Sequence, residues 1–233
     1  MSDPWDEAQV RARAMSGSLD QRLEVIRDAC RSLAPAYDAA VDALVDRLRA
    51  VDAGSAAPDV GDAFPDFALP DQAGRLWRLH VMRDGRPIVV ALHRGGWCDF
   101  CQVNLWALAE AHERILRAGG DIVAVAPQRA AWGARHRAGA GARFPMLSDV
   151  GGGVATLLGL SVVIDARLCD AFAAFDLNLA ETNGDQGLLL PIPATFVIGR
   201  DGRVCARHID VDPRRRMDVG AMVQAVSIAA SRA

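Results

Sequence analysis

Two cysteines separated by two residues, Cys98 and Cys101, are the side chains of this 233-residue chain that most clearly suit chemistry. An apolar run over residues 88–92 precedes them, a turn follows at 94–96, and a helix is predicted to begin near Cys98. Unpaired backbone N–H groups and the helix dipole favour negative charge at a helix N-terminus, so a thiol there loses its proton more readily. Because the two thiols share one helix face, they can form a redox-active disulfide.

The composition excludes several classes of function. Hydrophobic residues make up 51% of the chain, enough for a large core, and the net charge of -3 gives no reason to expect nucleic acid or an anionic membrane as partner. The acidic start lacks the pattern of a signal peptide, and no apolar run reaches transmembrane length. Five cysteines with one close pair are not the framework of a secreted disulfide-rich domain. We therefore expect a cytoplasmic protein.

The pattern along the chain predicts three parts: an N-terminal helical extension (1–51), a linker (52–59) and a main domain (60–233). Apolar stripes predict two helices in the extension, separated at Pro35. The first helix should begin at a capping box, in which Ser18 is followed three residues later by Gln21. Both stripes need a partner, which could be the main domain or, in a homodimer, a second subunit.

The main domain alternates strand and helix patterns, which is typical of an α/β fold. The strand, helix and strand that include Cys98 imply a right-handed crossover with parallel pairing. The other expected elements are a hairpin around the turn at 71–74, a helix from Cys98 to the glycines at 119–120, helices at 128–138, 166–175 and 219–226, strands at 87–93, 122–126, 191–198 and 203–208, and a polar loop at 181–187.

Four stretches, in this order and spacing, resemble the alkyl hydroperoxide reductase/thiol-specific antioxidant (AhpC/TSA) family, the peroxiredoxin branch of the thioredoxin-like superfamily. They are Val60–Leu69, Arg94–Cys101, Phe144–Asp149 and Pro193–Val204. The second stretch, Arg-Gly-Gly-Trp-Cys-Asp-Phe-Cys, is similar to a W-C-x-x-C subgroup. The resemblance implies a thioredoxin-like fold, with a central mixed sheet flanked by helices. It does not extend to the N-terminal extension.

The resemblance, with the helix argument, implies that Cys98 is the nucleophile and Cys101 the resolving thiol. Reaction with a peroxide would give a sulfenic acid on Cys98, and reaction with a disulfide substrate would give a mixed disulfide. Both routes end in a Cys98–Cys101 bridge that an external dithiol, thioredoxin- or glutaredoxin-like, must reduce. No bound cofactor is needed.

The sequence also departs from the family pattern. Ala91 stands where the family has a proline, and Gly95 where it has a threonine or serine whose hydroxyl contacts thiolate and peroxide. A second family arginine is absent, and the residues there are Ile192 and Pro193. Pro193 instead matches the cis-proline that thioredoxins place against their cysteine pair.

Three functions therefore stay open: a thiol peroxidase for hydrogen peroxide or organic hydroperoxides, a protein thiol–disulfide oxidoreductase, and a non-enzymatic copper chaperone or redox sensor. The third would use the cysteine pair with His208. A ribbon-type metal site is not expected, since it needs a second close pair of cysteine or histidine ligands.

Around the pair, Trp97 could shield the thiolate or serve core packing. Arg94 could supply the missing positive charge, although a solvated or ion-paired turn residue is the more common role. His93 could tune the site or serve a structural role. His112 shares the helix stripe and is expected to be a hydrogen-bonded core residue.

The three remaining cysteines have simpler interpretations. Cys30, on an apolar helix stripe, and Cys205, in a strand, are expected to be buried core thiols. Cys169 lies in a less regular segment and is an alternative resolving thiol.

Overall fold

A central five-stranded sheet organises the computed structural model, which describes residues 4–184 and 188–231. Its order is β5-β4-β3-β8-β9, with β3, β4 and β5 parallel and β8 and β9 antiparallel to their neighbours. The strands are β3 (Ile88–Leu92), β4 (Asp121–Ala126), β5 (Met146–Ser148), β8 (Ala194–Ile198) and β9 (Val204–Ile209). The predicted mixed sheet, and its parallel β3–β4 pairing, are confirmed.

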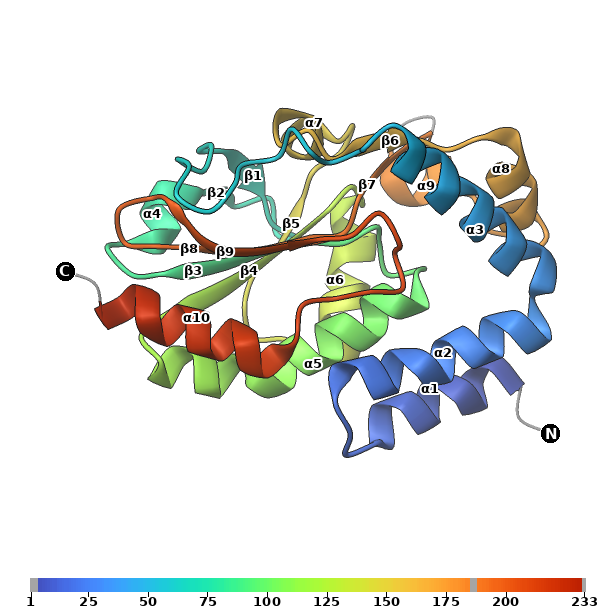
Figure 1. Cartoon of the computed structure of the whole chain (residues 1–233), viewed down its shortest axis with the longest axis horizontal. Coiled ribbons are helices and arrows are strands. Elements are labelled where there is room, and N and C mark those ends of the chain that lie inside the picture. The colour runs from blue at the N-terminus through green and yellow to red at the C-terminus, as the bar shows by residue number, and fades with distance from the viewer. Residues whose placement is uncertain (1–3, 185–187, 232–233) are drawn as a thin grey trace.

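Helices cover both faces of the sheet (Figure 1). Along β3, Val89 and Ala91 point to the core shared with α5 and α10, while Val90 and Leu92 point to the opposite core. Both faces of the strand are therefore buried, which explains why its sequence is continuously apolar. The helices after the N-terminal region are α4 (Leu79–Arg83), α5 (Asp99–Arg117), α6 (Ala130–Ala140), α7 (Gly153–Leu157), α8 (Ala166–Ala173), α9 (Leu179–Asn183) and α10 (Val219–Ser231).

Two smaller sheets flank the central one. The predicted hairpin is formed by β1 (Ala68–Pro70) and β2 (Leu76–Arg78). A second pair, β6 (Ser161–Val163) and β7 (Leu189–Pro191), was not expected. The predicted strand at 191–198 is therefore divided, since β7 ends at Pro191 and β8 begins at Ala194. The predicted polar loop at 181–187 overlaps α9, whereas residues 185–187 lie outside the described residues.

The N-terminal region contains three helices rather than two: α1 (Pro4–Ala14), α2 (Leu19–Leu33) and α3 (Pro35–Ala50), together called the N-terminal helices here. The capping box at Ser18 and Gln21 is confirmed, and Pro35 begins α3 directly after α2. Helix α1 escaped prediction because its buried residues are alanines, Ala8 and Ala12, which make no strong apolar stripe.

The N-terminal helices bury their stripes against the rest of the same chain. Leu23 and Ile26 of α2 share a core with α5, and Leu44 of α3 packs in a cluster with Leu168 and Phe172 of α8. Of the two alternatives for these stripes, the intramolecular one is therefore observed, and the argument for a homodimer through them loses its main support. Among the described residues, no helix combines the length and apolar character needed to cross a membrane.

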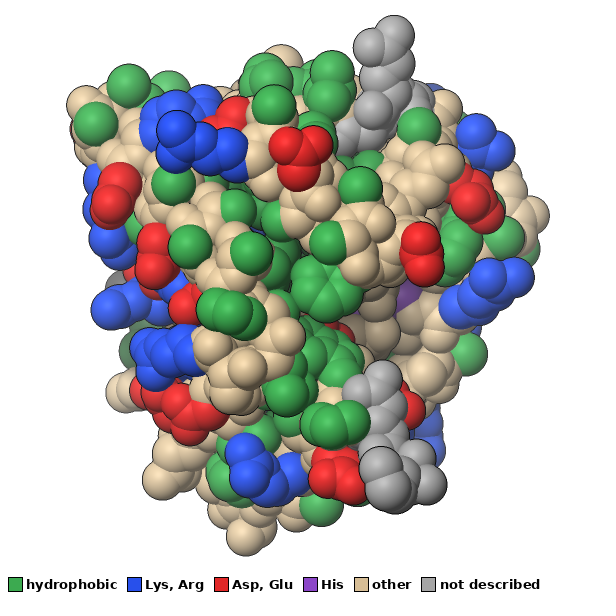
Figure 2. Space-filling model, turned by 90° about the vertical axis from the view of Figure 1, so that its right-hand side faces the viewer, with side chains coloured by type: hydrophobic (Ala, Val, Ile, Leu, Met, Phe, Trp, Pro, Cys, Tyr) green, Lys and Arg blue, Asp and Glu red, His purple; other side chains and the backbone are tan. Residues whose placement is uncertain are grey.

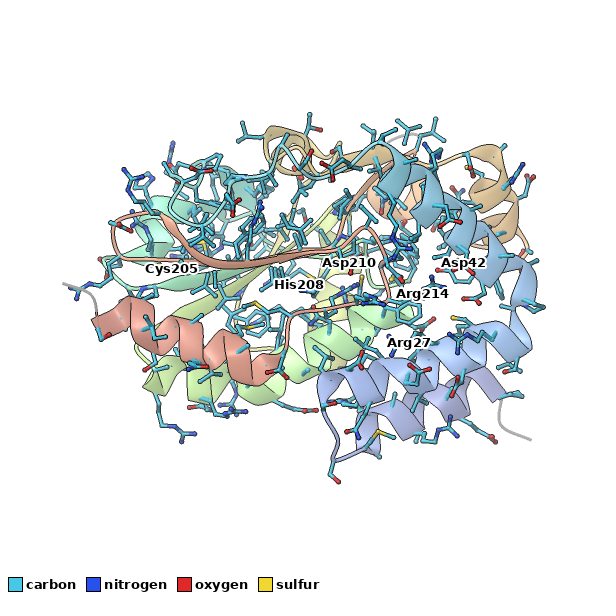
Figure 3. The ribbon with its side chains drawn as sticks, viewed as in Figure 1. Arg27, Asp42, Cys205, His208, Asp210 and Arg214 are labelled. Atoms are coloured by element: carbon cyan, nitrogen blue, oxygen red, sulfur yellow. The ribbon has the colours of Figure 1, made fainter. Side chains whose placement is uncertain are left out.

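Arg214, in the segment between β9 and α10, ties this segment to the N-terminal helices (Figure 3). Its guanidinium pairs with Asp38 at 3.0 Å and Asp42 at 2.5 Å, both on α3, and with Asp212 at 2.8 Å. Arg27 of α2 donates a hydrogen bond to the Arg214 carbonyl at 3.2 Å. Because Arg214 is largely buried, this network fixes the chain just before α10.

Candidate active site

The cysteine pair lies where β3 passes through a tight loop into α5. Cys98 is the N-cap residue of α5, and its carbonyl accepts hydrogen bonds from the Cys101 and Gln102 backbone N–H groups at 2.8 and 2.9 Å. Cys98 and Cys101 are both free thiols. The position predicted for the pair, at the start of the helix after the central strand, is therefore observed.

Gly95 is required by the loop and could not be the hydroxyl residue of the family pattern. Its φ is +146°, in the region that favours glycine. A Cβ at this position would lie 2.4 Å from Nε1 of Trp97, a distance that side chains do not reach. The indole ring of Trp97 therefore occupies the space beside Gly95 that the side chain of a threonine or serine would need.

The two thiols have different environments. Cys101 is fully buried, and its Sγ accepts hydrogen bonds from the Arg94 backbone N–H at 3.4 Å and from Nη2 of Arg216 at 3.5 Å. Burial alone would raise the pKa of Cys101, but the hydrogen bond from Cys98 and the charge of Arg216 lower it well below its usual range. The hydrogen bond to Cys101, together with burial, raises the pKa of Cys98.

The expectation that the helix N-terminus lowers the pKa of Cys98 therefore does not describe the reduced pair. Cys98 is the cap itself, and its side chain makes no capping hydrogen bond. The donors converge one turn later, on Cys101. The physical reason is tertiary, because Arg216 comes from the segment before α10 and is 115 residues away in sequence.

Arg94 is not the solvated or ion-paired turn residue that its position suggested. It is 2% exposed, and it makes no ion pair within the described part of the chain. Its guanidinium carbon lies 5.0 Å from the centroid of the Trp97 ring and 6.0 Å from that of Phe172. Burial acts to lower its pKa, but Tyr37 and the two thiols outweigh this and raise it. A buried positive charge therefore lies beside both cysteines.

A cavity of about 350 Å³ lies next to Cys98. Its lining comes from three regions: the N-terminal helices, the start of α5, and the segment at and after α8. The lining residues are Trp5, Gln9, Cys30, Tyr37, Gly96, Trp97, Cys98, Asp99, Phe100, Gln102, Phe172, Phe175, Asp176 and Leu177. Cys98, but not Cys101, lines this space, so it is the thiol that a small molecule would meet.

Polar side chains surround Cys101 on its other side. Nε2 of His93 lies 2.9 Å from Oδ1 of Asn104, and the His93 and His136 rings lie 5.8 Å apart. Burial lowers the pKa of both histidines, that of His136 to about 3, so both are neutral at pH 7. A Cβ on Gly96 would lie 2.9 Å from the His136 side chain, which explains the second glycine of the loop.

The structure corrects the prediction for Pro193. No cis peptide bond occurs among the described residues, so the Ile192–Pro193 bond is trans. Pro193 is nevertheless buried and lines a small separate cavity together with Arg94. The cis form rested on resemblance alone, and here the trans peptide leads directly into the antiparallel pairing of β8 with β3.

The other candidate residues lie outside the site or at its edge. His112 is buried with its Nε2 3.0 Å from Asp121, as predicted, whereas Cys205 is only half-buried on the sheet-edge strand β9. Cys30 is buried, as predicted, but it also lines the cavity at Cys98, and burial raises its pKa to about 12. Cys169 on α8 lines a different cavity, and burial raises its pKa.

His208 lies on β9, where its register partner is Thr195 (Figure 3). Within residues 4–184 and 188–231, no three His, Cys, Asp or Glu side chains gather as a metal site requires. The copper hypothesis, which joined His208 to the cysteine pair, therefore has no geometric support in the described structure.

Comparison with known proteins identifies the family. The family model described as "AhpC/TSA family" matches residues 60–207. The chain belongs to the AhpC/TSA family. Membership of this family makes the protein an oxidoreductase of the thiol peroxidase type. No curated protein matches the sequence.

Solved structures with the same fold come from both redox classes. Peroxidoxin BcpB from Mycobacterium tuberculosis has 20% identity and a TM-score of 0.57, with 73% of this chain and 97% of that chain covered. Reduced Prx3 from Vibrio vulnificus, solved in complex with hydrogen peroxide, has 16% identity and a TM-score of 0.57, with 72% and 98% covered. A putative thiol:disulfide interchange protein DsbE from Chlorobium tepidum has 22% identity and a TM-score of 0.53, with 75% and 99% covered.

Several site residues were not found by sequence reasoning. Arg216 ends a run of three arginines, and that run was the one local signal that a charge cluster precedes the last helix. Tyr37 is the single tyrosine of the chain, and Trp5 is an aromatic residue near the start of a polar helix. Their rarity could have marked them as candidates, but nothing local indicated that they meet at Cys98.

Proposed function

We propose that this AhpC/TSA protein is a thiol peroxidase in which Cys98 attacks the peroxide and Cys101 resolves the product. The observation that carries the assignment is the division between the two thiols. Cys98 lines the cavity, whereas Cys101 is fully buried and receives the hydrogen bonds that stabilise a thiolate.

Because Cys101 receives hydrogen bonds from Arg94 and Arg216, it has a role before the disulfide forms. The Cys98 thiol donates its hydrogen bond to the Cys101 sulfur, so Cys101 can accept the Cys98 proton as Cys98 attacks. The Cys98 sulfur bonds to one peroxide oxygen, the O–O bond breaks, and the other oxygen takes the proton from Cys101 and leaves as water or alcohol, so that Cys101 is a thiolate again. Cys98 is then a sulfenic acid.

Resolution follows within the same helix turn. The Cys101 thiolate attacks the sulfenic sulfur of Cys98, a disulfide forms, and the hydroxyl group leaves with a proton as water. Arg94 and Arg216 keep positive charge near both sulfurs throughout. We propose that a thioredoxin- or glutaredoxin-like dithiol then reduces the bridge, as the chemistry requires no bound cofactor. A reducing cytoplasm would supply such a partner.

Mass spectrometry of the reduced protein after one equivalent of peroxide tests the assignment. We expect a Cys98–Cys101 disulfide in the wild type, a trappable sulfenic acid on Cys98 in Cys101→Ser, and unmodified Cys101 in Cys98→Ser. Cys205→Ser is the matched control, because Cys205 lies on β9 outside the cavity. A sulfenic acid on Cys101 in Cys98→Ser, with none on Cys98 in Cys101→Ser, would reverse the two roles.

Insulin reduction separates this function from a protein disulfide oxidoreductase. In the dithiol form Cys98 is only 2% exposed and lies beside aromatic side chains, so an insulin disulfide is not expected to reach it, whereas the dithiol partner that reduces the Cys98–Cys101 bridge has to displace these side chains. We expect little insulin reduction by the dithiol form. Rapid reduction, without consumption of peroxide, would favour the oxidoreductase instead.

A further inference from the structure

The cavity at Cys98 is lined by an aromatic wall. The ring centroids of Trp5 and Phe175 lie 6.3 Å apart, and those of Tyr37 and Phe175 lie 6.1 Å apart. Phe172 is 5.9 Å from Tyr37 and 5.1 Å from Trp97 by the same measure. The rings come from α1, α3, the loop before α5, and the segment at the end of α8, so their meeting depends on the N-terminal helices.

Figure 2 looks onto the end of the molecule formed by α1, α2, α3 and α8, where hydrophobic side chains gather around the centre. Phe175 is 52% exposed although it lines the cavity. The cavity volume of about 350 Å³ falls in the range of small-molecule sites, which are mostly apolar with a few polar groups.

The charges at the cavity are acidic. Asp99 and Asp176 line it, and no arginine, lysine or histidine is among its lining residues. The guanidinium of Arg94 lies close by, but it stacks on Trp97 and Phe172 and lines a different cavity. A carboxylate or phosphate on a ligand would therefore find no basic side chain in the lining.

Asp99 also holds the wall in place. It accepts hydrogen bonds from Nε1 of Trp5 at 3.1 Å and from Nε2 of Gln9 at 2.5 Å, and both donors are on α1. Since Asp99 is the first residue of α5, directly after Cys98, helix α1 is fastened beside the thiol. The wall is therefore part of the site and not a remote cover.

We propose that this aromatic wall makes Cys98 selective for uncharged, bulky apolar hydroperoxides, with Trp5 and Tyr37 of the N-terminal helices and Phe175 after α8 as the specificity-determining residues. The proposal rests on the peroxidase function proposed above. Hydrogen peroxide is too small to contact the wall and so gains nothing from it. An uncharged aromatic hydroperoxide can bury its apolar body there while its O–O group reaches Cys98.

Steady-state kinetics with three peroxides test the selectivity. We expect kcat/KM for cumene hydroperoxide, which is aromatic and uncharged, to exceed that for hydrogen peroxide and that for linoleic acid hydroperoxide, which carries a carboxylate. Phe175→Ala should lower the ratio of kcat/KM for cumene hydroperoxide to kcat/KM for hydrogen peroxide about tenfold. Leu157→Ala is the matched control, because Leu157 is an equally exposed apolar residue on α7, outside the cavity.

A binding measurement keeps the proposal testable without turnover. Cumyl alcohol, the redox-inert product, should change the tryptophan fluorescence of the wild type, and Phe175→Ala should weaken its binding about tenfold. Equal kcat/KM for cumene hydroperoxide and hydrogen peroxide, or no binding of cumyl alcohol, would overturn the selectivity. A preference for the carboxylate-bearing hydroperoxide would also overturn it and would point to Arg94. If cumyl alcohol binds but no peroxide oxidises Cys98, the peroxidase function fails instead.

Discussion

The part of the chain that matches the family model and the parts on either side of it contribute different things to one site. Residues 60–207 supply both thiols and the buried Arg94. The residues before this match supply Trp5 and Tyr37 to the cavity wall, and those after it supply Arg216, which donates to Cys101. The family frame thus positions the sulfur atoms and supplies part of their surroundings, and the flanking segments complete those surroundings.

The position of the two cysteines and the selectivity for a substrate therefore depend on different parts of the chain. The frame would bring two cysteines together at a helix start whatever packed around them, because β3 and α5 are built from local patterns. The substrate-facing surface and part of the thiolate-stabilising charge depend on segments more than 90 residues away in sequence, through the contacts of Trp5 with Asp99 and Arg216 with Cys101. Three substitutions test where the boundary between these contributions lies.

The largest effect is expected from restoring the hydroxyl of the family pattern at Gly95. Gly95→Thr should lower the free energy of unfolding by about 3 kcal/mol or more, since it adds a strained φ and a Cβ that collides with Trp97. The midpoint temperature of thermal unfolding and the rate of Cys98 oxidation by peroxide should both fall. Gly141→Ala isolates the backbone cost, because φ there is +67° with nothing near the Cβ. A Gly95→Thr variant with wild-type stability and a faster reaction with peroxide would contradict this prediction, because the loop would then accept the hydroxyl residue of the family pattern.

Asp99→Asn tests the link between the frame and α1. Burial raises the pKa of Asp99 to about 6, above its usual value, so the folded state keeps a proton that the unfolded chain loses between about pH 4 and 6. Wild-type stability should therefore fall across that window relative to Asp99→Asn. The variant should be more stable by about 2 to 3 kcal/mol above pH 6 and equal near pH 4.

Urea denaturation of both proteins across this pH range measures the difference. Asp121→Asn is a useful comparison, since Asp121 is a half-buried carboxylate on β4 that bonds His112 instead of α1. A constant difference between Asp99→Asn and the wild type from pH 4 to pH 7 would contradict the assigned titration.

The smallest effect is expected at Arg216. Arg216→Met removes a charged donor to Cys101, so the pKa of Cys101 should rise and Cys98 should react with peroxide about tenfold more slowly. Ultraviolet absorbance of the thiolate as a function of pH, with stopped-flow oxidation, measures both. Arg215→Met is the control, because Arg215 is the 63% exposed neighbour in the same run. If both variants show the same pKa of Cys101 and the same rate of Cys98 oxidation, Arg216 does not contribute to stabilising the thiolate.

Prediction from sequence succeeded where a pattern is local. The capping box at Ser18 and the hairpin around residues 71–74 were read correctly, since their signals lie within a few neighbouring residues. Helix α1 was missed because alanines carry its packing. The cis form at Pro193 was wrong because it was transferred from a resemblance that the local pairing of β8 does not share.

The sequence by itself determined that two cysteines stand one helical turn apart at the start of a helix, after a strand buried on both faces. Those features follow from periodicity, glycine placement and spacing within about 30 residues. Only the tertiary structure decided that Cys101 receives the stabilising donors, that Arg94 is buried and that aromatic rings line the cavity at Cys98. The physical reason is that stabilisation of the Cys101 thiolate and burial of Arg94 and Cys98 depend on contacts with side chains distant in sequence, and only the packing of the folded chain makes these contacts.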